Sequence, residues 1–143
     1  MNESPSEYKF DEISIGDKKK FTEKIDESKL QEFAKLSGDF NPLHMNEEYA
    51  RTTKFKKRVC HGMLLASFFS KLVGMHLPGK NALYFSQDLN FQSPCYLGDQ
   101  ITVEGEVLDK SDSTQIITIK TSIYNQDGSC LLDGIAKVIM RED

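Results

Sequence analysis

Residues 61–77 form the segment that most limits the folds open to this chain. Between His61 and Leu77 almost every position is apolar or glycine, so a helix here has hardly any polar face. Such a helix must be buried on most of its sides. Pro78 and Gly79 come next, and this pair predicts that the helix ends there. The rest of the chain therefore has to enclose a central helix.

The second half of the chain has the pattern of a β-sheet. Apolar and polar residues alternate with a period of two, and turn residues separate the stretches. The pattern predicts strands at 82–91, 100–108, 114–124 and 131–140, and a weaker alternation at 18–25 offers a first strand. Because short turns join consecutive strands, we expect an antiparallel meander rather than alternating strands and helices.

Two shorter helices are expected between the first strand and the central helix. Asp26 or Ser28 can cap the first helix, whose apolar residues recur at helical spacing. Gly38 suits the C-terminus of this helix, because glycine tolerates the left-handed conformation. Asn46 can cap the second helix, with two glutamates in its first turn, where negative charge complements the helix dipole.

A sheet curled around one buried helix is the economical way to combine these elements. This arrangement is an α+β architecture, the hot-dog fold. The chain has 143 residues, which suits a single domain over 1–143, with residues 1–10 as a loosely held arm. Since a long sheet leaves an edge strand that dimerisation commonly covers, we expect a homodimer.

Composition and charge exclude several classes of protein. The formal net charge of −4 gives no basic footprint for nucleic acid. The polar N-terminus is no signal peptide, and Ser67 breaks the longest apolar run, so no membrane-spanning segment is expected. Cys60, Cys95 and Cys130 follow no metal or disulfide spacing, which is typical of a reducing cytoplasm. We therefore expect a cytoplasmic protein with no metal site.

Residues 37–44, Ser-Gly-Asp-Phe-Asn-Pro-Leu-His, carry the first candidate chemistry. Pro42 disfavours helical geometry at Asn41, so an irregular and fairly rigid turn is expected. Such a turn would bring Asp39 and His44 together, and an acid and an imidazole can jointly hold a water and move its protons. Asn41 could fix either partner by hydrogen bonding. Taken singly, each of these residues is more often a turn or structural residue than a catalytic one.

The start of the central helix supplies the second candidate. Backbone N–H groups in the first turn of a helix have no intrahelical partner, so the N–H of Gly62 could bind a negatively charged oxygen, such as that of a thioester enolate. The alternative is that Gly62 only allows close packing. We expect a functional role for the Gly62 N–H and a structural role for His61, which precedes it.

Together these two segments resemble the signature of the type 2, (R)-specific enoyl-CoA hydratases of the MaoC-like hot-dog family. The similarity continues in His61–Ser67, Leu77–Lys80, Leu89–Phe91 and Leu97–Asp99. It covers most of the chain from about Phe33 to Val107. The chain is most similar to short bacterial enzymes that supply (R)-3-hydroxyacyl-CoA, for example to polyhydroxyalkanoate synthesis.

The resemblance implies reversible syn addition of water to a trans-2-enoyl-CoA, an acyl-CoA substrate, without a metal or redox cofactor. It implies that Asp39 and His44 are the acid–base pair, and it leaves open which is the acid and which the base. The Gly62 N–H would polarise the thioester carbonyl.

The resemblance also implies three substrate-binding residues. Ser70 would lie beside the site, and Asn41 would belong to the same group. Val73 would line the acyl pocket, where its size, smaller than that of leucine, could admit a longer acyl chain.

A basic run precedes the Gly62 turn and leaves further alternatives open. Lys54, Lys56, Lys57 and Arg58 could steer or hold the phosphates of CoA, although a solvated loop explains them equally well. One alternative function is a 3-hydroxyacyl-carrier-protein dehydratase, with an acidic carrier protein docking near this run. Another is a hot-dog module that binds acyl-CoA without turnover, which the presence of both Asp39 and His44 disfavours.

Overall fold

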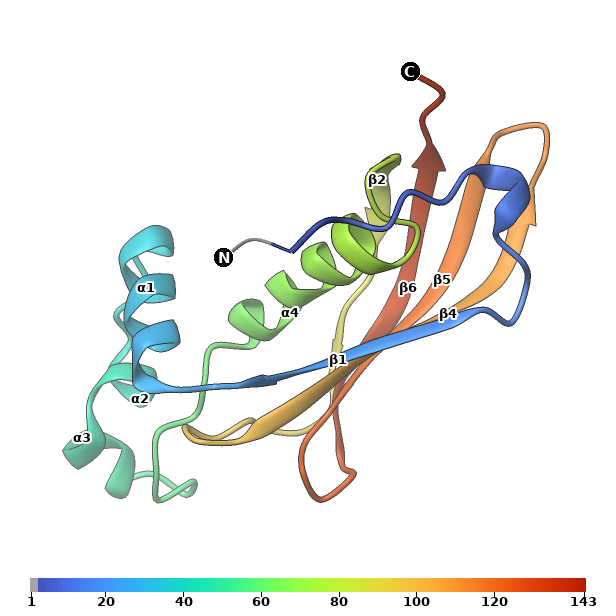
Figure 1. The fold of residues 1–143 in the computed structure, drawn as a ribbon. Coiled ribbons are helices and arrows are strands. Elements are labelled where there is room, and N and C mark those ends of the chain that lie inside the picture. Colours follow the sequence, from blue (N-terminus) through green and yellow to red (C-terminus); the bar gives the residue numbers. More distant parts are fainter. Residues whose placement is uncertain (1–2) are drawn as a thin grey trace.

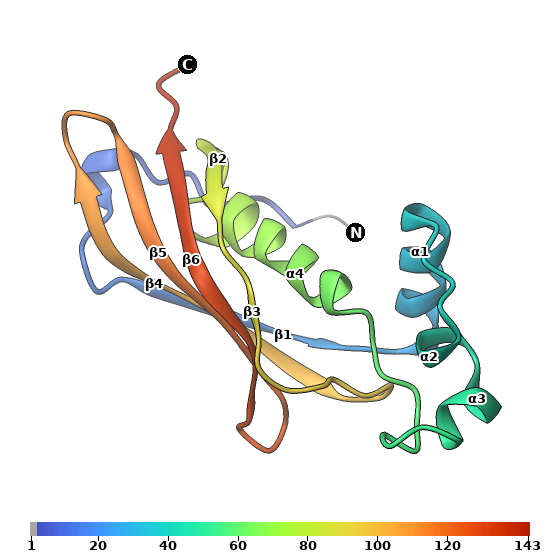
Figure 2. The same ribbon diagram turned by 180° about the vertical axis from the view of Figure 1, so that it is seen from behind.

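The structure is a computed structural model, and it describes residues 3–143. A twisted antiparallel sheet of six strands wraps around one long helix, and the shorter helices gather beyond one end of that helix (Figures 1 and 2). The strands are β1 (Lys18–Lys24), β2 (Ala82–Gln87), β3 (Asn90–Phe91), β4 (Gln100–Ser111), β5 (Ile116–Tyr124) and β6 (Cys130–Met140). Their order is β1-β4-β5-β6-β2, with β3 also paired to β6. The expected antiparallel pairing is confirmed, but only β4, β5 and β6 form a meander, because β2 and β3 pair with β6 and not with β4.

The helices follow from local capping signals. They are α1 (Glu27–Ser37), α2 (Pro42–Met45), α3 (Glu47–Arg51) and α4 (Gly62–Lys71), with a π-helical turn at Leu72–His76 and a 3₁₀ turn at Phe10–Glu12. Asp26 caps α1 by accepting a hydrogen bond from the Lys29 N–H at 3.0 Å. Gly38 ends α1 with a φ of 83°, the left-handed conformation expected of it. Asn46 caps α3 through the Tyr49 N–H at 2.9 Å, as the sequence predicts.

The core lies between α4 and the sheet. Leu65, Phe69 and Leu72 are buried together with Val103 and Ile123 of the central strands. Removing these side chains from water supplies the main favourable free energy for docking the helix. A β-carbon added to Gly105 on β4 would stand 2.9 Å from the Cδ2 atom of Leu72, so glycine is what allows the helical segment to approach this strand.

The central helix is buried on most of its sides, as predicted, but one narrow face is exposed. Met63, Ser67 and Ser70 are open to solvent, and Met63 exposes 56% of its surface. The helix also changes from α to π geometry at Leu72, before the predicted end at Leu77. The sheet covers only one side of α4, and the short helices lie beyond its N-terminus instead of over its free face (Figure 1).

Two local predictions differ from the structure. Pro42–Met45 is a helical turn, α2, and not an irregular one, because proline at the first helical position needs no N–H partner and already has a helical φ. The strand expected at 82–91 is divided into β2 and β3. Between them the carboxylate of Asp88 accepts a hydrogen bond from the Ile135 N–H at 3.0 Å, in place of a regular ladder bond.

The N-terminal segment is attached to the domain, contrary to the expected loose arm. The Ser6 N–H donates to the Met75 carbonyl at 2.9 Å, the Lys80 N–H donates to the Ser6 carbonyl at 2.7 Å, and Phe10 is buried in the core. Residues 1 and 2 of the predicted arm lie outside the described part of the chain. Among residues 3–143, none of the helices has the length and apolarity needed to span a bilayer.

Candidate active site

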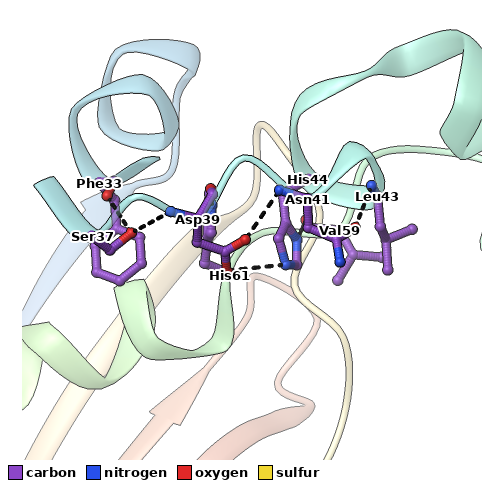
Figure 3. Close-up of polar contacts among 8 residues, drawn as sticks. All are labelled: Phe33, Ser37, Asp39, Asn41, Leu43, His44, Val59 and His61. Carbon is purple, nitrogen blue, oxygen red and sulfur yellow. Dashed lines mark hydrogen bonds and ion pairs between the residues drawn. The ribbon is translucent and has the colours of Figure 1, made fainter. Parts of the chain in front are cut away.

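Asp39 and His44 lie side by side, as the sequence predicts. The Oδ2 atom of Asp39 is 4.0 Å from the Nε2 atom of His44 (Figure 3). This distance is too long for a direct hydrogen bond, but it allows one water to contact both atoms. The imidazole is mostly covered, whereas about half of the carboxylate side chain is exposed, so the pair borders solvent. The two groups are thus placed to share one small polar molecule.

Hydrogen bonds within the loop orient Asp39. The Asn41 N–H donates to its Oδ1 atom at 3.1 Å, which leaves Oδ2 directed toward His44. The Asp39 N–H donates to the Ser37 hydroxyl at 3.2 Å, and that hydroxyl donates to the Phe33 carbonyl at 2.7 Å. Ser37 therefore ties the loop to the last turn of α1.

A backbone carbonyl selects the tautomer of His44. Its Nδ1 atom lies 2.6 Å from the Val59 carbonyl oxygen, which can only accept, so Nδ1 carries the proton. In the neutral imidazole the Nε2 atom is then unprotonated. This free acceptor is the atom that faces the Asp39 carboxylate.

Arg58 holds the segment that carries His44. Its Nε–H donates to the His44 carbonyl at 2.6 Å, and its two terminal nitrogens donate to the Glu27 carboxylate at 2.6 and 2.7 Å. The hydrogen bonds from Arg58 lower the pKa of Glu27 below its usual value. The sequence groups Arg58 with the basic residues that could bind phosphates, and this prediction is wrong because Arg58 is buried. Its side chain instead connects the start of α1 to α2.

His61 contacts both members of the pair. It is 1% exposed, and its Nε2–H donates to the backbone carbonyl of Asp39 at 3.0 Å. Its ring centroid lies 4.2 Å from that of His44, and the edge of Phe33 packs against its other side. Burial lowers the pKa of His61, which favours the neutral form. The expected structural role is thus a direct support of the candidate catalytic residues, and the position of His61 just before Gly62 was its only sequence signal.

The same three residues are the set that could hold a metal ion. Asp39, His44 and His61 offer ligand atoms that all lie within 4.8 Å of one another. However, Nδ1 of His44 and Nε2 of His61 already donate to backbone carbonyls. The remaining Nδ1 atom of His61 is buried and has no hydrogen-bond partner among the described residues. Only Asp39 and His44 therefore present free atoms to the space between them, which fits a water better than a metal with three or four protein ligands.

Gly62 lies at the first position of α4, on the groove that His44 also borders. This groove has a volume of about 310 Å³. The Gly62 N–H has no intrahelical acceptor, and no other acceptor engages it within residues 3–143. A β-carbon at this position would stand 2.7 Å from the Phe91 ring, so close packing requires glycine here. This agrees with the alternative interpretation of Gly62, and the role of its N–H in binding an oxygen stays a prediction.

The three predicted binding residues have different surroundings. Ser70 lies on the exposed face of α4 and lines a second, mostly apolar groove of about 390 Å³ with Met63 and Phe33. Val73 is part of the π-helical turn and is buried in the core. The side chain of Asn41 caps α2 by accepting from the Leu43 N–H at 3.0 Å. Asn41, Ser70 and Val73 as substrate-binding residues therefore stay predictions.

We predict that replacement of His61 lowers turnover and leaves substrate affinity nearly unchanged. In His61→Phe the ring contact to His44 is kept, but the donor to the Asp39 carbonyl is lost. Small displacements of catalytic groups cost about 10- to 100-fold, so kcat should fall by that factor at constant KM. His61→Gln keeps an amide donor and should recover part of kcat. Steady-state kinetics on the three proteins measure this.

His76 provides the matched control. It is also a largely covered histidine with a lowered pKa caused by burial, and it stacks on Phe21 at the other end of the helical segment. His76→Phe should keep the wild-type kcat. Equal losses in the two Phe variants, or a change confined to thermal stability, would contradict a positioning role for His61.

Comparison with known proteins shows to which family this chain belongs. Residues 11–127 match the MaoC like domain. An (R)-specific enoyl-CoA hydratase from Aeromonas caviae is 40% identical over 126 residues, which cover 88% of this chain and 94% of the relative. A mitochondrial 3-hydroxyacyl-[acyl-carrier-protein] dehydratase from Arabidopsis thaliana is 34% identical, with 90% of this chain and 78% of the relative covered.

Solved structures agree with this assignment. R-hydratase PhaJ1 from Pseudomonas aeruginosa superimposes with a TM-score of 0.90 at 39% identity, over 94% of this chain and 86% of that chain. An (R)-hydratase from A. caviae involved in PHA biosynthesis superimposes with a TM-score of 0.88 at 40% identity, over 90% and 97%. The fold is the hot-dog fold, and the chain belongs to the MaoC-like family.

Proposed function

We propose that this protein is an (R)-specific enoyl-CoA hydratase, a hydro-lyase that adds water reversibly to trans-2-enoyl-CoA. The observation that carries the proposal is the separation of 4.0 Å between the Asp39 carboxylate and the free Nε2 atom of His44. Two acceptors at this distance can bind both hydrogens of one water. The A. caviae hydratase, at 40% identity, supports the choice of substrate.

In the hydration direction the water held by the pair attacks C3 of the enoyl thioester. The new C3–O bond forms as one O–H bond of the water breaks, and its proton passes to the pair. The electrons of the C2–C3 double bond shift toward the thioester, and C2 then takes a proton back from the pair. One water is consumed and no electron is gained or lost overall, so the reaction needs no redox cofactor. The proposal assigns the proton transfers to Asp39 and His44 and includes no metal.

The stereochemistry follows from the position of the pair. Because Asp39 and His44 lie only 4.0 Å apart, the oxygen and the proton would reach C3 and C2 from the same face of the substrate. This geometry supports syn addition. The Gly62 N–H at the start of α4 would stabilise the negative charge on the thioester oxygen, where a fixed backbone donor costs no reorganisation during the reaction.

The proposal also covers the cellular location and the metabolic use of the enzyme. The free thiols of all three cysteines support action in the cytoplasm. The A. caviae structure supports supply of (R)-3-hydroxyacyl-CoA to polyhydroxyalkanoate synthesis as the metabolic use. Dehydration of a 3-hydroxyacyl carrier protein is the second candidate, favoured by the Arabidopsis relative and by the reversibility of the chemistry.

The proposed working form is a homodimer joined through the free edge at β2. This strand lies at the end of the sheet order, and its Leu83 and Phe85 side chains expose 54% and 61% of their surfaces. An exposed apolar edge strand is a ready site for pairing with a second copy. Dimerisation would bury both side chains.

Phe85→Glu should therefore convert a dimer to a monomer, because it places a charge at the proposed interface. Light scattering coupled to gel filtration measures the mass of each species. Leu36→Glu is the control, since Leu36 is a fully exposed apolar residue on α1, away from β2. A monomeric wild-type protein, or a variant that remains a dimer, would exclude this interface.

The enzyme should hydrate crotonyl-CoA to (R)-3-hydroxybutyryl-CoA. Loss of the conjugated enoyl-thioester absorbance follows the reaction, and chiral analysis identifies the product. Because the proposed chemistry uses only protein groups and water, a chelator such as EDTA should leave the rate unchanged. An (S) product, or no turnover of short and medium acyl chains, would show that the proposed function is wrong.

Asp39→Asn and His44→Ala should each lower kcat for crotonyl-CoA by about 100-fold or more, the usual contribution of a general acid or base. Asp39→Asn keeps an acceptor for the Asn41 N–H, so the loop should stay folded. Asp112→Asn, in the exposed turn between β4 and β5, is the charge-matched control and should keep full activity. A folded Asp39 or His44 variant with near wild-type kcat would exclude that residue from the pair.

A further inference from the structure

The groove beside His44 reaches the lysine-rich loop after α3. His44 and Gly62 line it, and so does Phe55, which belongs to that loop. Most of the other lining side chains are apolar, among them Phe91 and Pro94. A channel of this kind suits an uncharged chain that leads from the reacting thioester to the protein surface.

Three lysines flank Phe55 at this outer part of the groove. Lys54, Lys56 and Lys57 are exposed, and none of them forms an ion pair with an acidic residue in the described part of the chain. The Nζ atom of Lys57 lies 4.3 Å from the centre of the Tyr96 ring. The local positive charge is therefore not neutralised by the protein, although the whole chain carries a net charge of −4.

The turn that carries these lysines is well connected. The Thr53 hydroxyl donates to the Ala50 carbonyl at 2.7 Å and accepts from the Phe55 N–H at 3.2 Å. The Lys56 N–H donates to the Thr53 carbonyl at 3.2 Å. Phe55 thus projects into the groove while its neighbours project to solvent. Positive charge is therefore concentrated on the turn whose Phe55 lines the groove.

We propose that this groove binds the pantetheine arm of coenzyme A, and that Lys54, Lys56 and Lys57 bind its phosphates. The inference rests on the proposed function. It assigns the binding of the coenzyme A moiety to this groove and to the lysine-rich turn. The pantetheine arm is uncharged and suits the apolar channel, whereas the diphosphate and 3′-phosphate gather several negative charges at its end. Three lysines on one short turn match this compact charge better than the extended surface of a carrier protein. Exposed pairs of this kind are weakened by salt.

The test compares two thioesters that differ only in the phosphate-bearing part. The variant Lys54→Gln/Lys56→Gln/Lys57→Gln should lose about 10-fold in kcat/KM for crotonyl-CoA at low ionic strength, mainly through KM. With crotonyl-pantetheine, which lacks the phosphates, the variant should match the wild type. High ionic strength should reduce the difference on crotonyl-CoA.

The matched control removes three lysines elsewhere. Lys18, Lys19 and Lys20 begin β1, at the end of the sheet away from α3 (Figures 1 and 2). Lys18→Gln/Lys19→Gln/Lys20→Gln changes the net charge equally and should leave crotonyl-CoA kinetics unchanged. An equal loss in both triple variants would overturn the proposal, since only general attraction would then be at work.

Three further outcomes would also overturn it: an equal loss on both thioesters, no loss on crotonyl-CoA, or a loss seen only with crotonyl-acyl carrier protein. Calorimetric titration with coenzyme A itself separates this inference from the proposed function. A wild type that hydrates neither thioester contradicts the hydratase. Even then, a roughly 10-fold weaker coenzyme A affinity in the Lys54/Lys56/Lys57 variant supports the phosphate site, and an equal affinity overturns it.

Discussion

Burial of α4 against the twisted sheet is the constraint on which the rest of the structure depends. Leu65, Phe69 and Leu72 lose their contact with water only while the helix keeps one position on the sheet. Its first turn is therefore fixed, and His61 and Gly62 stand at that point. A core without any reacting group thus determines where the candidate chemistry takes place.

The catalytic pair is held by a second segment of the chain. The carbonyls of Asp39 and His44 accept from His61 and Arg58, and the Val59 carbonyl accepts from the His44 ring. These contacts leave Nε2 of His44 and Oδ2 of Asp39 facing each other (Figure 3). The loop is therefore oriented mainly by backbone acceptors and by two buried side chains.

Predictions that depend on neighbouring residues were correct. Asp26, Gly38 and Asn46 cap helices because their effect needs only the next few backbone groups. Asn41 is not helical, as predicted from Pro42, but the helical turn that begins at Pro42 was not expected, because the same residue is compatible with a turn and with the first position of a helix. The expected burial of α4 on most of its sides was correct, but the exposed face of this helix was not foreseen. Periodicity shows how apolar a helix is, but not how much of it the sheet covers.

The sequence by itself determined the order of helices and strands and the proximity of Asp39 to His44, since capping, alternation and a short loop act over a few residues. Only the tertiary structure decided that Arg58 is buried as a support of α2 and is unavailable to phosphates. Only the structure placed His61 against both members of the pair. The contacts responsible join residues 31 positions apart, for Arg58 and Glu27, and 22 apart, for His61 and Asp39. No local pattern specifies such pairings, because they form only when the sheet and α4 have brought the segments together.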